Sequence, residues 1–201
     1  MTISVCMALY SRPQMLPQIK EALKKQTFQD FEFLVWDNTK DNQGSKARFQ
    51  LVKKAKGDLI VFIDDDEIPH PDFLKYMHNQ AIEYPKHVLG WFTRIFNYSY
   101  RNAITYSKTG TEVDYVGTGG MIVDRMLFDG NSVLYDIPEE CAKAEDLFLS
   151  YIARQNGYKL RAVDCHLDMI KDGKNQCADL WDYKEKAFTY LKKMGWHTLN
   201  D

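Results

Sequence analysis

The hydrophobic positions in the first part of the chain alternate between two kinds of pattern. Three short, continuous apolar runs are typical of strands buried on both faces: Ile3–Leu9, Phe31–Trp36 and Leu59–Ile63. Apolar residues at helical spacing follow each run and predict three helices: around Ile19–Leu23, over Gly44–Ala55 and over Phe73–Tyr84. Strands that alternate with helices indicate an α/β fold with a mostly parallel sheet and right-handed crossovers.

The second part of the chain has a different pattern. Aromatic and β-branched residues predict further strands: Val88–Tyr100, Ile104–Tyr106, Met121–Val123 and Tyr158–Val163. Two helices are expected, over Ala144–Gln155 and, with an amphipathic pattern, over Leu180–Met194. We therefore expect one domain over residues 1–201, with halves at about 1–87 and 88–170 and a C-terminal helical extension at 171–201.

Polar residues follow each of the first three predicted strands directly. They are Ser11-Arg12, Asp37-Asn38 and the acidic run Asp64-Asp65-Asp66-Glu67. Ligands of open α/β sheets bind at the carboxyl ends of the strands. The topology thus predicts a binding site that these three clusters form together.

The acidic run is the sharpest chemical feature. Four consecutive carboxylates repel one another unless solvent or a cation relieves them. A solvated turn would explain the run, but its position after a buried strand favours a site for a hard cation such as Mg²⁺ or Mn²⁺.

Three other features allow two interpretations each. Glu145-Asp146 fits either the favourable charge of a first helical turn or a general base. His166 is either structural or a further ligand of a cation held by Asp66. The glycines of Gly117–Gly120 provide either a tight turn or a close approach of the backbone to a ligand.

Composition excludes several classes of function. The 201 residues include 26 basic and 28 acidic side chains, a formal net charge of −2, which argues against a nucleic-acid partner. No apolar run is long enough to span a membrane, and the N-terminus lacks the features of a signal peptide. The four cysteines have no paired spacing, so we expect a cytoplasmic protein without a disulfide framework.

Short motifs along the chain occur in the order that is typical of one large enzyme family. They are ISVCMALYSRP (3–13), QTFQDFEFLVWDN (26–38), KAR (46–48), AKGD (55–58), FIDDDE (62–67), GG (119–120), FD (128–129), EDL (145–147) and NGY (156–158). Together they resemble the inverting GT-A glycosyltransferases of family 2 over about residues 2–166. Ala8, Phe49 and Glu67 depart from the family pattern, where proline, asparagine and a third aspartate are usual.

The resemblance implies a GT-A fold, with a Rossmann-like nucleotide-binding half and a smaller mixed half for the acceptor. It implies transfer of a sugar from a nucleotide-diphosphate donor, a UDP-sugar, to a hydroxyl of a glycan or glycoconjugate, with Mn²⁺ or Mg²⁺ as cofactor. Asp146 would be the base and Asp66 a metal ligand, with His166 as the further ligand considered above. The implied donor contacts are Ala8, Tyr10, Arg12, Asp37, Arg48, Asp64, Asp65, Gly119 and Gly120. Acceptor recognition would then involve a neighbouring domain.

Other functions share parts of this pattern. An aspartyl-nucleophile phosphatase also has an apolar strand that ends in Asp-x-Asp, but usually on its first strand and with Thr or Val where Ile68 stands here. A nucleotidyltransferase would have a glycine-rich loop after the first strand, and Tyr10–Pro13 has no glycine. A non-catalytic module that binds nucleotide sugars is the third alternative.

Overall fold

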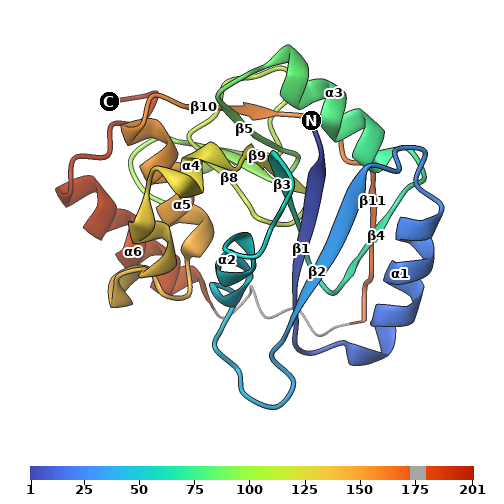
Figure 1. Cartoon of the computed structure of the whole chain (residues 1–201). Coiled ribbons are helices and arrows are strands. Elements are labelled where there is room, and N and C mark those ends of the chain that lie inside the picture. The colour runs from blue at the N-terminus through green and yellow to red at the C-terminus, as the bar shows by residue number, and fades with distance from the viewer. Residues whose placement is uncertain (173–179) are drawn as a thin grey trace.

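The computed structural model describes residues 1–172 and 180–201, and a six-stranded sheet runs through its centre (Figure 1). The strand order is β10-β5-β9-β3-β1-β2. The strands are β1 (Ile3–Leu9), β2 (Phe31–Asp37), β3 (Leu59–Ile63), β5 (His87–Gly90), β9 (Met121–Asp124) and β10 (Lys159–Ala162). Every residue of β1 and β3 is buried, as expected for strands covered on both faces.

The sheet is mainly parallel, which confirms the prediction from the strand–helix alternation. β1 pairs in parallel with both β2 and β3, and β5 pairs in parallel with β10. β9 is the exception, since it runs antiparallel between β3 and β5. The carboxyl ends of β1, β2 and β3 therefore meet at one edge, which is the lower edge in Figure 1.

Helices cover both faces of the sheet. The helices α1 (Leu16–Lys24) and α3 (Phe73–Glu83) pack on one face. On the other face lie α2 (Ala47–Val52), α4 (Met126–Asp129), α5 (Glu145–Gln155) and α6 (Trp181–Lys193). Short 3-10 turns lie at Pro13–Met15, Ser132–Tyr135 and Glu139–Cys141. The α6 helix thus closes the core on the side of α5, and the predicted helix over Leu180–Met194 is confirmed.

Two small antiparallel sheets lie beside the central one. β6 (Thr93–Phe96) runs between β7 (Ala103–Thr105) and β8 (Tyr115–Val116), and β4 (Glu67–Pro69) pairs with β11 (Leu167–Met169). Neither β4 nor β11 was predicted, because three residues are too few for a strand pattern to be recognised. The expected strand Val88–Tyr100 is divided, since β5 and β6 belong to different sheets.

The predicted helix over Gly44–Ala55 is shorter in the structure. Gly44 has φ +77°, a left-handed conformation that cannot belong to a right-handed helix, and α2 begins only at Ala47. Part of the expected extension at 171–201 lies outside the described residues, as does Cys177. Among the described helices, none has both the length and the apolar character that crossing a membrane requires.

Candidate active site

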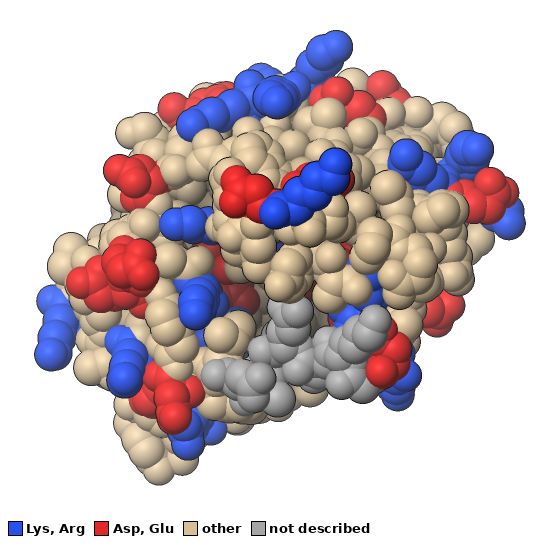
Figure 2. All heavy atoms as spheres, turned by 90° about the horizontal axis from the view of Figure 1, so that it is seen from below, with Lys and Arg blue, Asp and Glu red and all other residues tan. Residues whose placement is uncertain are grey.

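A cavity of about 520 Å³ opens at the carboxyl ends of β1, β2 and β3. Figure 2 looks onto this edge of the molecule and shows acidic and basic side chains side by side around a hollow. The cavity brings together most of the site residues that the sequence indicated: Ala8, Tyr10, Arg12, Arg48, Asp64, Asp65, Asp66 and Asp146. Side chains from both halves of the chain therefore face one space.

The first group in the cavity is an acidic centre, Asp64–Glu67, in the turn after β3. Asp64 Oδ1 lies 2.6 Å from Arg48 Nη1, and Asp66 Oδ2 lies 3.4 Å from Arg12 Nη1. Burial and then the neighbouring Asp64 carboxylate raise the pKa of Asp66 from 3.8 to about 6. The carboxylates are thus crowded even with two arginines beside them.

Asp65 supports the loop that follows β1. Its side chain accepts hydrogen bonds from the backbone N–H groups of Tyr10 (2.9 Å) and Arg12 (3.2 Å) and from the Arg12 guanidinium (3.2 Å). Arg12 also donates two hydrogen bonds of 3.0 Å to Asp172, which lies beyond β11. Asp65 and Asp172, which are far apart in the sequence, therefore both hold Arg12 at the cavity wall, and Asp65 also holds the loop after β1.

Glu67 lies beneath the acidic centre and is 1% exposed. Its Oε2 accepts a hydrogen bond of 2.8 Å from the Asp64 backbone N–H. Burial and the Asp64 carboxylate raise its pKa well above the ordinary value. A Cβ atom at Gly119 would overlap Glu67 Oε1 and approach Asp64 Oδ2 to 3.0 Å, so the absence of a side chain at Gly119 makes this packing possible. Gly119 and Gly120 themselves do not line the cavity, although the neighbouring Thr118 does.

The second group in the cavity stands at the beginning of α5. Asp146 is buried, and its Oδ2 accepts hydrogen bonds from Lys184 Nζ (2.7 Å) and from the Tyr115 hydroxyl (2.5 Å). Burial alone would raise the pKa of Asp146, but the Lys184 ammonium and these hydrogen bonds outweigh it and lower the pKa. Asp146 is therefore ionised at neutral pH.

Arg48 connects the two groups. Besides its contact with Asp64, its Nε lies 3.9 Å from Glu145 Oε1, and Glu145 also accepts a hydrogen bond of 2.5 Å from the Ser45 hydroxyl. Its guanidinium is almost fully buried, and the nearby carboxylates raise its pKa although burial opposes this. Arg48 is thus a fixed positive charge between two acidic groups.

Asp37, which the resemblance implies as a donor contact, does not line the cavity. Asp37 is exposed and accepts hydrogen bonds from the Thr39 N–H (2.9 Å) and hydroxyl (2.5 Å), while the buried Asn38 lines the cavity instead. Asn38 binds the backbone of the next loop through Gly44 O (3.0 Å) and Gln43 N (3.2 Å). The polar pair after β2 was identified correctly, but the member that faces the cavity is the second one.

His166 is not brought to Asp66, and this corrects the expectation that the two bind one cation. The register of β4 and β11 pairs Leu167 with Pro69, so His166 stands opposite His70. Four residues of extended chain separate His70 from Asp66, roughly 13 Å. His166 does not line the cavity.

Sequence reasoning missed Lys184, which approaches the cavity from α6. The apolar stripe of that helix, Leu180, Ala187, Leu191 and Met194, includes position 184 at the same spacing. A lysine in an apolar stripe was therefore the available signal. Asp172 and Tyr115 had no comparable signal in the sequence.

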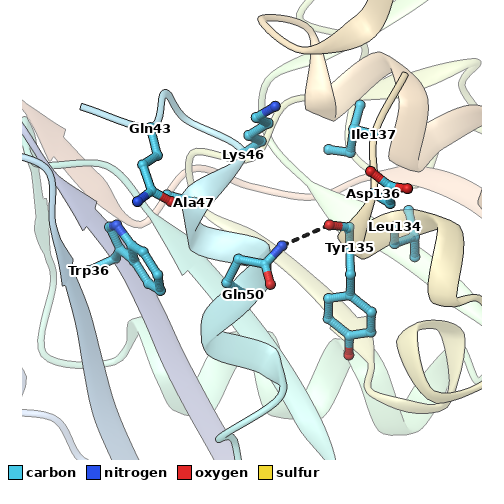
Figure 3. A pocket seen from close by; sticks show the side chains of 9 residues that line it. All are labelled: Trp36, Gln43, Lys46, Ala47, Gln50, Leu134, Tyr135, Asp136 and Ile137. Carbon is cyan, nitrogen blue, oxygen red and sulfur yellow. Dashed lines mark hydrogen bonds between the residues drawn. The ribbon is translucent and has the colours of Figure 1, made fainter. Parts of the chain in front are cut away.

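A second cavity, of about 290 Å³, lies between β2, α2 and the turn over Ser132–Tyr135 (Figure 3). Trp36 and Tyr135 are on opposite sides of it, and the Gln50 amide donates a hydrogen bond of 2.8 Å to the Tyr135 carbonyl. Lys46, Ala47 and Gln50 line this second cavity, whereas Ser45 and Arg48 of the same segment face the first cavity. Of the described residues that line it, none is among the donor contacts, the metal ligands or the base that the resemblance implied.

Comparison with known proteins agrees with this fold. The family model described as glycosyl transferase family 2 matches residues 38–134, which include Arg48 and the acidic centre. The structure of Staphylococcus aureus TarS 1–349 in complex with UDP-GlcNAc matches with a TM-score of 0.63 and 20% identity, over 87% of this chain and 60% of that chain. The same fragment in complex with UDP matches with a TM-score of 0.58 and 21% identity, over 82% and 61%. No curated protein sequence matches the chain.

The chain therefore has the GT-A fold, a class in which an α/β sheet presents a ligand site at its strand ends. Within that class, residues 38–134 are similar to glycosyl transferase family 2, the family that the motifs resemble. At about 20% identity the structural matches establish the fold alone. The chain spans about 60% of the length of the TarS fragments that it matches.

Proposed function

We propose that the chain is a metal-dependent, inverting glycosyltransferase that moves a sugar from a nucleotide-diphosphate donor, a UDP-sugar, to a hydroxyl of a glycan or glycoconjugate. The observation that carries this proposal is the pairing of two different acidic groups across one cavity. One group is crowded with carboxylates, and the other holds the ionised carboxylate of Asp146 at the beginning of a helix. Complexes of TarS with UDP and UDP-GlcNAc support a uridine nucleotide as the donor.

The acidic centre fits a hard divalent cation. Asp64 and Asp66 both line the cavity and supply carboxylate oxygens, the ligand type that Mg²⁺ and Mn²⁺ prefer. Burial and the neighbouring Asp64 carboxylate raise the pKa of Asp66, and a cation would relieve the repulsion between the carboxylates. A cation held by these residues would neutralise the charge that the diphosphate gains as its bond to the sugar breaks.

The arginines at the cavity wall are suited to hold the donor phosphates. Arg12 and Arg48 are both buried, and carboxylates fix their side chains in place. Because these guanidinium groups are already oriented, little conformational entropy is lost when a phosphate binds beside them.

Asp146 would remove the proton from the acceptor hydroxyl. An ionised carboxylate offers about four acceptor positions, and Lys184, Tyr115 and the Leu147 N–H take three of them. The remaining position can accept the proton of a hydroxyl as its oxygen attacks the sugar. Lys184 lowers the basicity of Asp146, but it keeps the carboxylate ionised and oriented. Attack from one side as the nucleotide leaves on the other is a single displacement, which inverts the anomeric carbon.

The acceptor would be recognised together with residues outside this chain, such as a neighbouring domain, since the TarS fragments are longer than the matched region. A cytoplasmic location is supported by the three described cysteines, Cys6, Cys141 and Cys165, all of which are free.

A donor screen followed by a transfer assay tests the proposal. Thermal shift with Mn²⁺ and a panel of nucleotide sugars should reveal the donor, because a ligand that binds the native state raises its stability. Release of the nucleoside diphosphate, with the product anomer determined by NMR, should then show transfer with inversion. Release of phosphate from a phosphomonoester would support the phosphatase alternative instead, and donor binding without transfer or hydrolysis would support a binding module.

A further inference from the structure

Three metal-binding side chains converge at the end of the β4–β11 pair that is remote from the cavity. His70, Asp72 and His166 each offer a ligand atom, and these atoms lie within 4.8 Å of one another. His70 and Asp72 follow β4, while His166 precedes β11, more than 90 residues further along the chain. The cluster is therefore built by tertiary structure.

The backbone holds these residues in place. The antiparallel ladder pairs Leu167 with Pro69, and the His70 N–H continues it with a hydrogen bond of 3.0 Å to the His166 carbonyl. The two imidazole rings thus lie on neighbouring strands, with ring centroids 6.3 Å apart. Asp72 immediately precedes α3, so its position is tied to that helix.

The rings are also oriented by side chains. Tyr76 stacks on His166 with a centroid distance of 4.2 Å and an interplanar angle of 16°. The remaining contacts are polar, since His166 Nδ1 lies 3.0 Å from Asp72 Oδ2 and His70 Nε2 lies 3.1 Å from Asp168 Oδ1. A carboxylate next to each imidazole favours binding of a cation there.

We propose that His70, Asp72 and His166 form a binding site for Zn²⁺ or a similar transition-metal cation, separate from the acidic centre. Two imidazole nitrogens and one carboxylate oxygen are ligands typical of Zn²⁺, whereas Mg²⁺ prefers oxygen ligands alone. Ligand atoms around tetrahedral Zn²⁺ are roughly 3.3 Å apart, so small rotations of these partly exposed side chains would close the site. Three protein ligands leave the fourth position to water.

An ion at this site would join the β4–β11 pair to the beginning of α3. The residues that follow β11 contact two residues that line the cavity. The Ile170 N–H donates a hydrogen bond to the Asp66 carbonyl (2.8 Å), and Asp172 binds Arg12. Binding of the ion should therefore stabilise the segment that supports Arg12. This site does not depend on the proposed transferase activity.

Zn²⁺ titration by calorimetry, with Co²⁺ absorption spectra to report nitrogen ligands, tests the site in the metal-free whole chain. We expect one high-affinity Zn²⁺ per chain and a rise in the thermal midpoint. Loss of even an outer hydrogen-bond partner of a metal ligand costs about 10- to 100-fold in affinity, so His166→Ala and His70→Ala should each weaken binding by at least about tenfold. His197→Ala is the matched control, since its imidazole is 89% exposed and outside the cluster.

Asp66→Ala separates this site from the acidic centre. Zn²⁺ affinity that survives in Asp66→Ala and is lost in His166→Ala supports the proposal. Unchanged affinity in both histidine variants, or loss in Asp66→Ala alone, would overturn it, as would failure of the wild-type chain to bind Zn²⁺. If an alanine variant does not fold, as judged by circular dichroism, His166→Gln and His70→Gln provide the same comparison.

Discussion

The acidic centre after β3 and the carboxylates at the beginning of α5 face the same cavity, but their surroundings shift the carboxylate pKa in opposite directions. At the acidic centre, burial and then the neighbouring Asp64 carboxylate raise the pKa of Asp66 to about 6 although Arg12 is close. At α5, Lys184 forms an ion pair of 2.7 Å with Asp146 and lowers its pKa. The first group is crowded with carboxylates and is suited to a cation, while the second holds the ionised Asp146 in place and is suited to accept a proton.

The largest effect should come from removing the carboxylate at α5. Asp146→Asn keeps the size of the side chain but removes the proton acceptor, so the transfer rate should fall by about 10²- to 10⁴-fold. UDP affinity, measured by calorimetry with Mn²⁺, should stay nearly unchanged, because the acidic centre is intact. Asp136→Asn, at an exposed position outside the cavity, is the control and should behave as the wild type. Transfer at the wild-type rate in Asp146→Asn would show that Asp146 is not the base.

Lys184→Met should turn the α5 group into one that resembles the acidic centre. Without the ammonium, Asp146 stays buried and its pKa should rise, so the acid limb of the transfer rate should move to higher pH. The loss of one partner from a buried ion pair should also destabilise the chain by about 3 to 5 kcal/mol at neutral pH, measured by denaturant unfolding.

The sign of the pH dependence checks this assignment. The pKa of Asp146 is lowered by folding, so the stability that it gains is present at neutral pH and is lost as the pH falls through its folded pKa. The difference in stability between wild type and Lys184→Met should therefore shrink towards acid pH. Lys184→Arg should restore much of the wild-type behaviour, and the exposed Lys186→Met is the matched control on the same helix. A constant difference at every pH would contradict an ion pair with Asp146.

Proton competition should distinguish the acidic centre from the α5 group. Because Asp66 has a pKa of about 6, Mn²⁺ affinity should be about tenfold weaker at pH 5 than at pH 7. Without metal, this raised pKa means that the native chain binds the proton more tightly than the unfolded chain. The contribution of Asp66 to the stability of the native chain should therefore fall as the pH rises from about 4 to 6. Calorimetric Mn²⁺ titrations at several pH values test this, and affinity that does not change with pH would contradict the assignment to Asp66.

The smallest effect is expected at Gly119, which touches the acidic centre from behind. Gly119→Ala places a methyl group against Glu67 and Asp64, which should cost about 1 to 3 kcal/mol of stability and weaken Mn²⁺ binding. Gly130→Ala is the comparison, since its Cβ would meet the Met126 carbonyl oxygen at 3.3 Å, and neither residue lines the cavity. Equal stability losses in the two variants would show that the packing at Gly119 has no special role.

The sequence predicted the parts of this molecule that depend on local pattern. Continuous apolar runs identified β1, β2 and β3, and the polar residues after them identified the edge of the sheet where the cavity lies. The parts that were missed depend on contacts between distant segments. Lys184 meets Asp146 only because α6 packs against α5, and Asp172 meets Arg12 across 160 residues. The register of the short β4–β11 pair decides that His166 lies beside His70, and three-residue strands carry no pattern that could predict it.

A crystal structure of the chain with UDP and Mn²⁺, with anomalous diffraction to locate the manganese, tests the central claim most directly. The account predicts UDP in the 520 Å³ cavity, with its diphosphate facing Asp64 and Asp66 and an anomalous peak next to these two carboxylates. The same experiment with Asp66→Ala should lose the peak. UDP bound in the cavity with manganese elsewhere, or with the same peak in Asp66→Ala, would contradict the assignment of the acidic centre as the metal site.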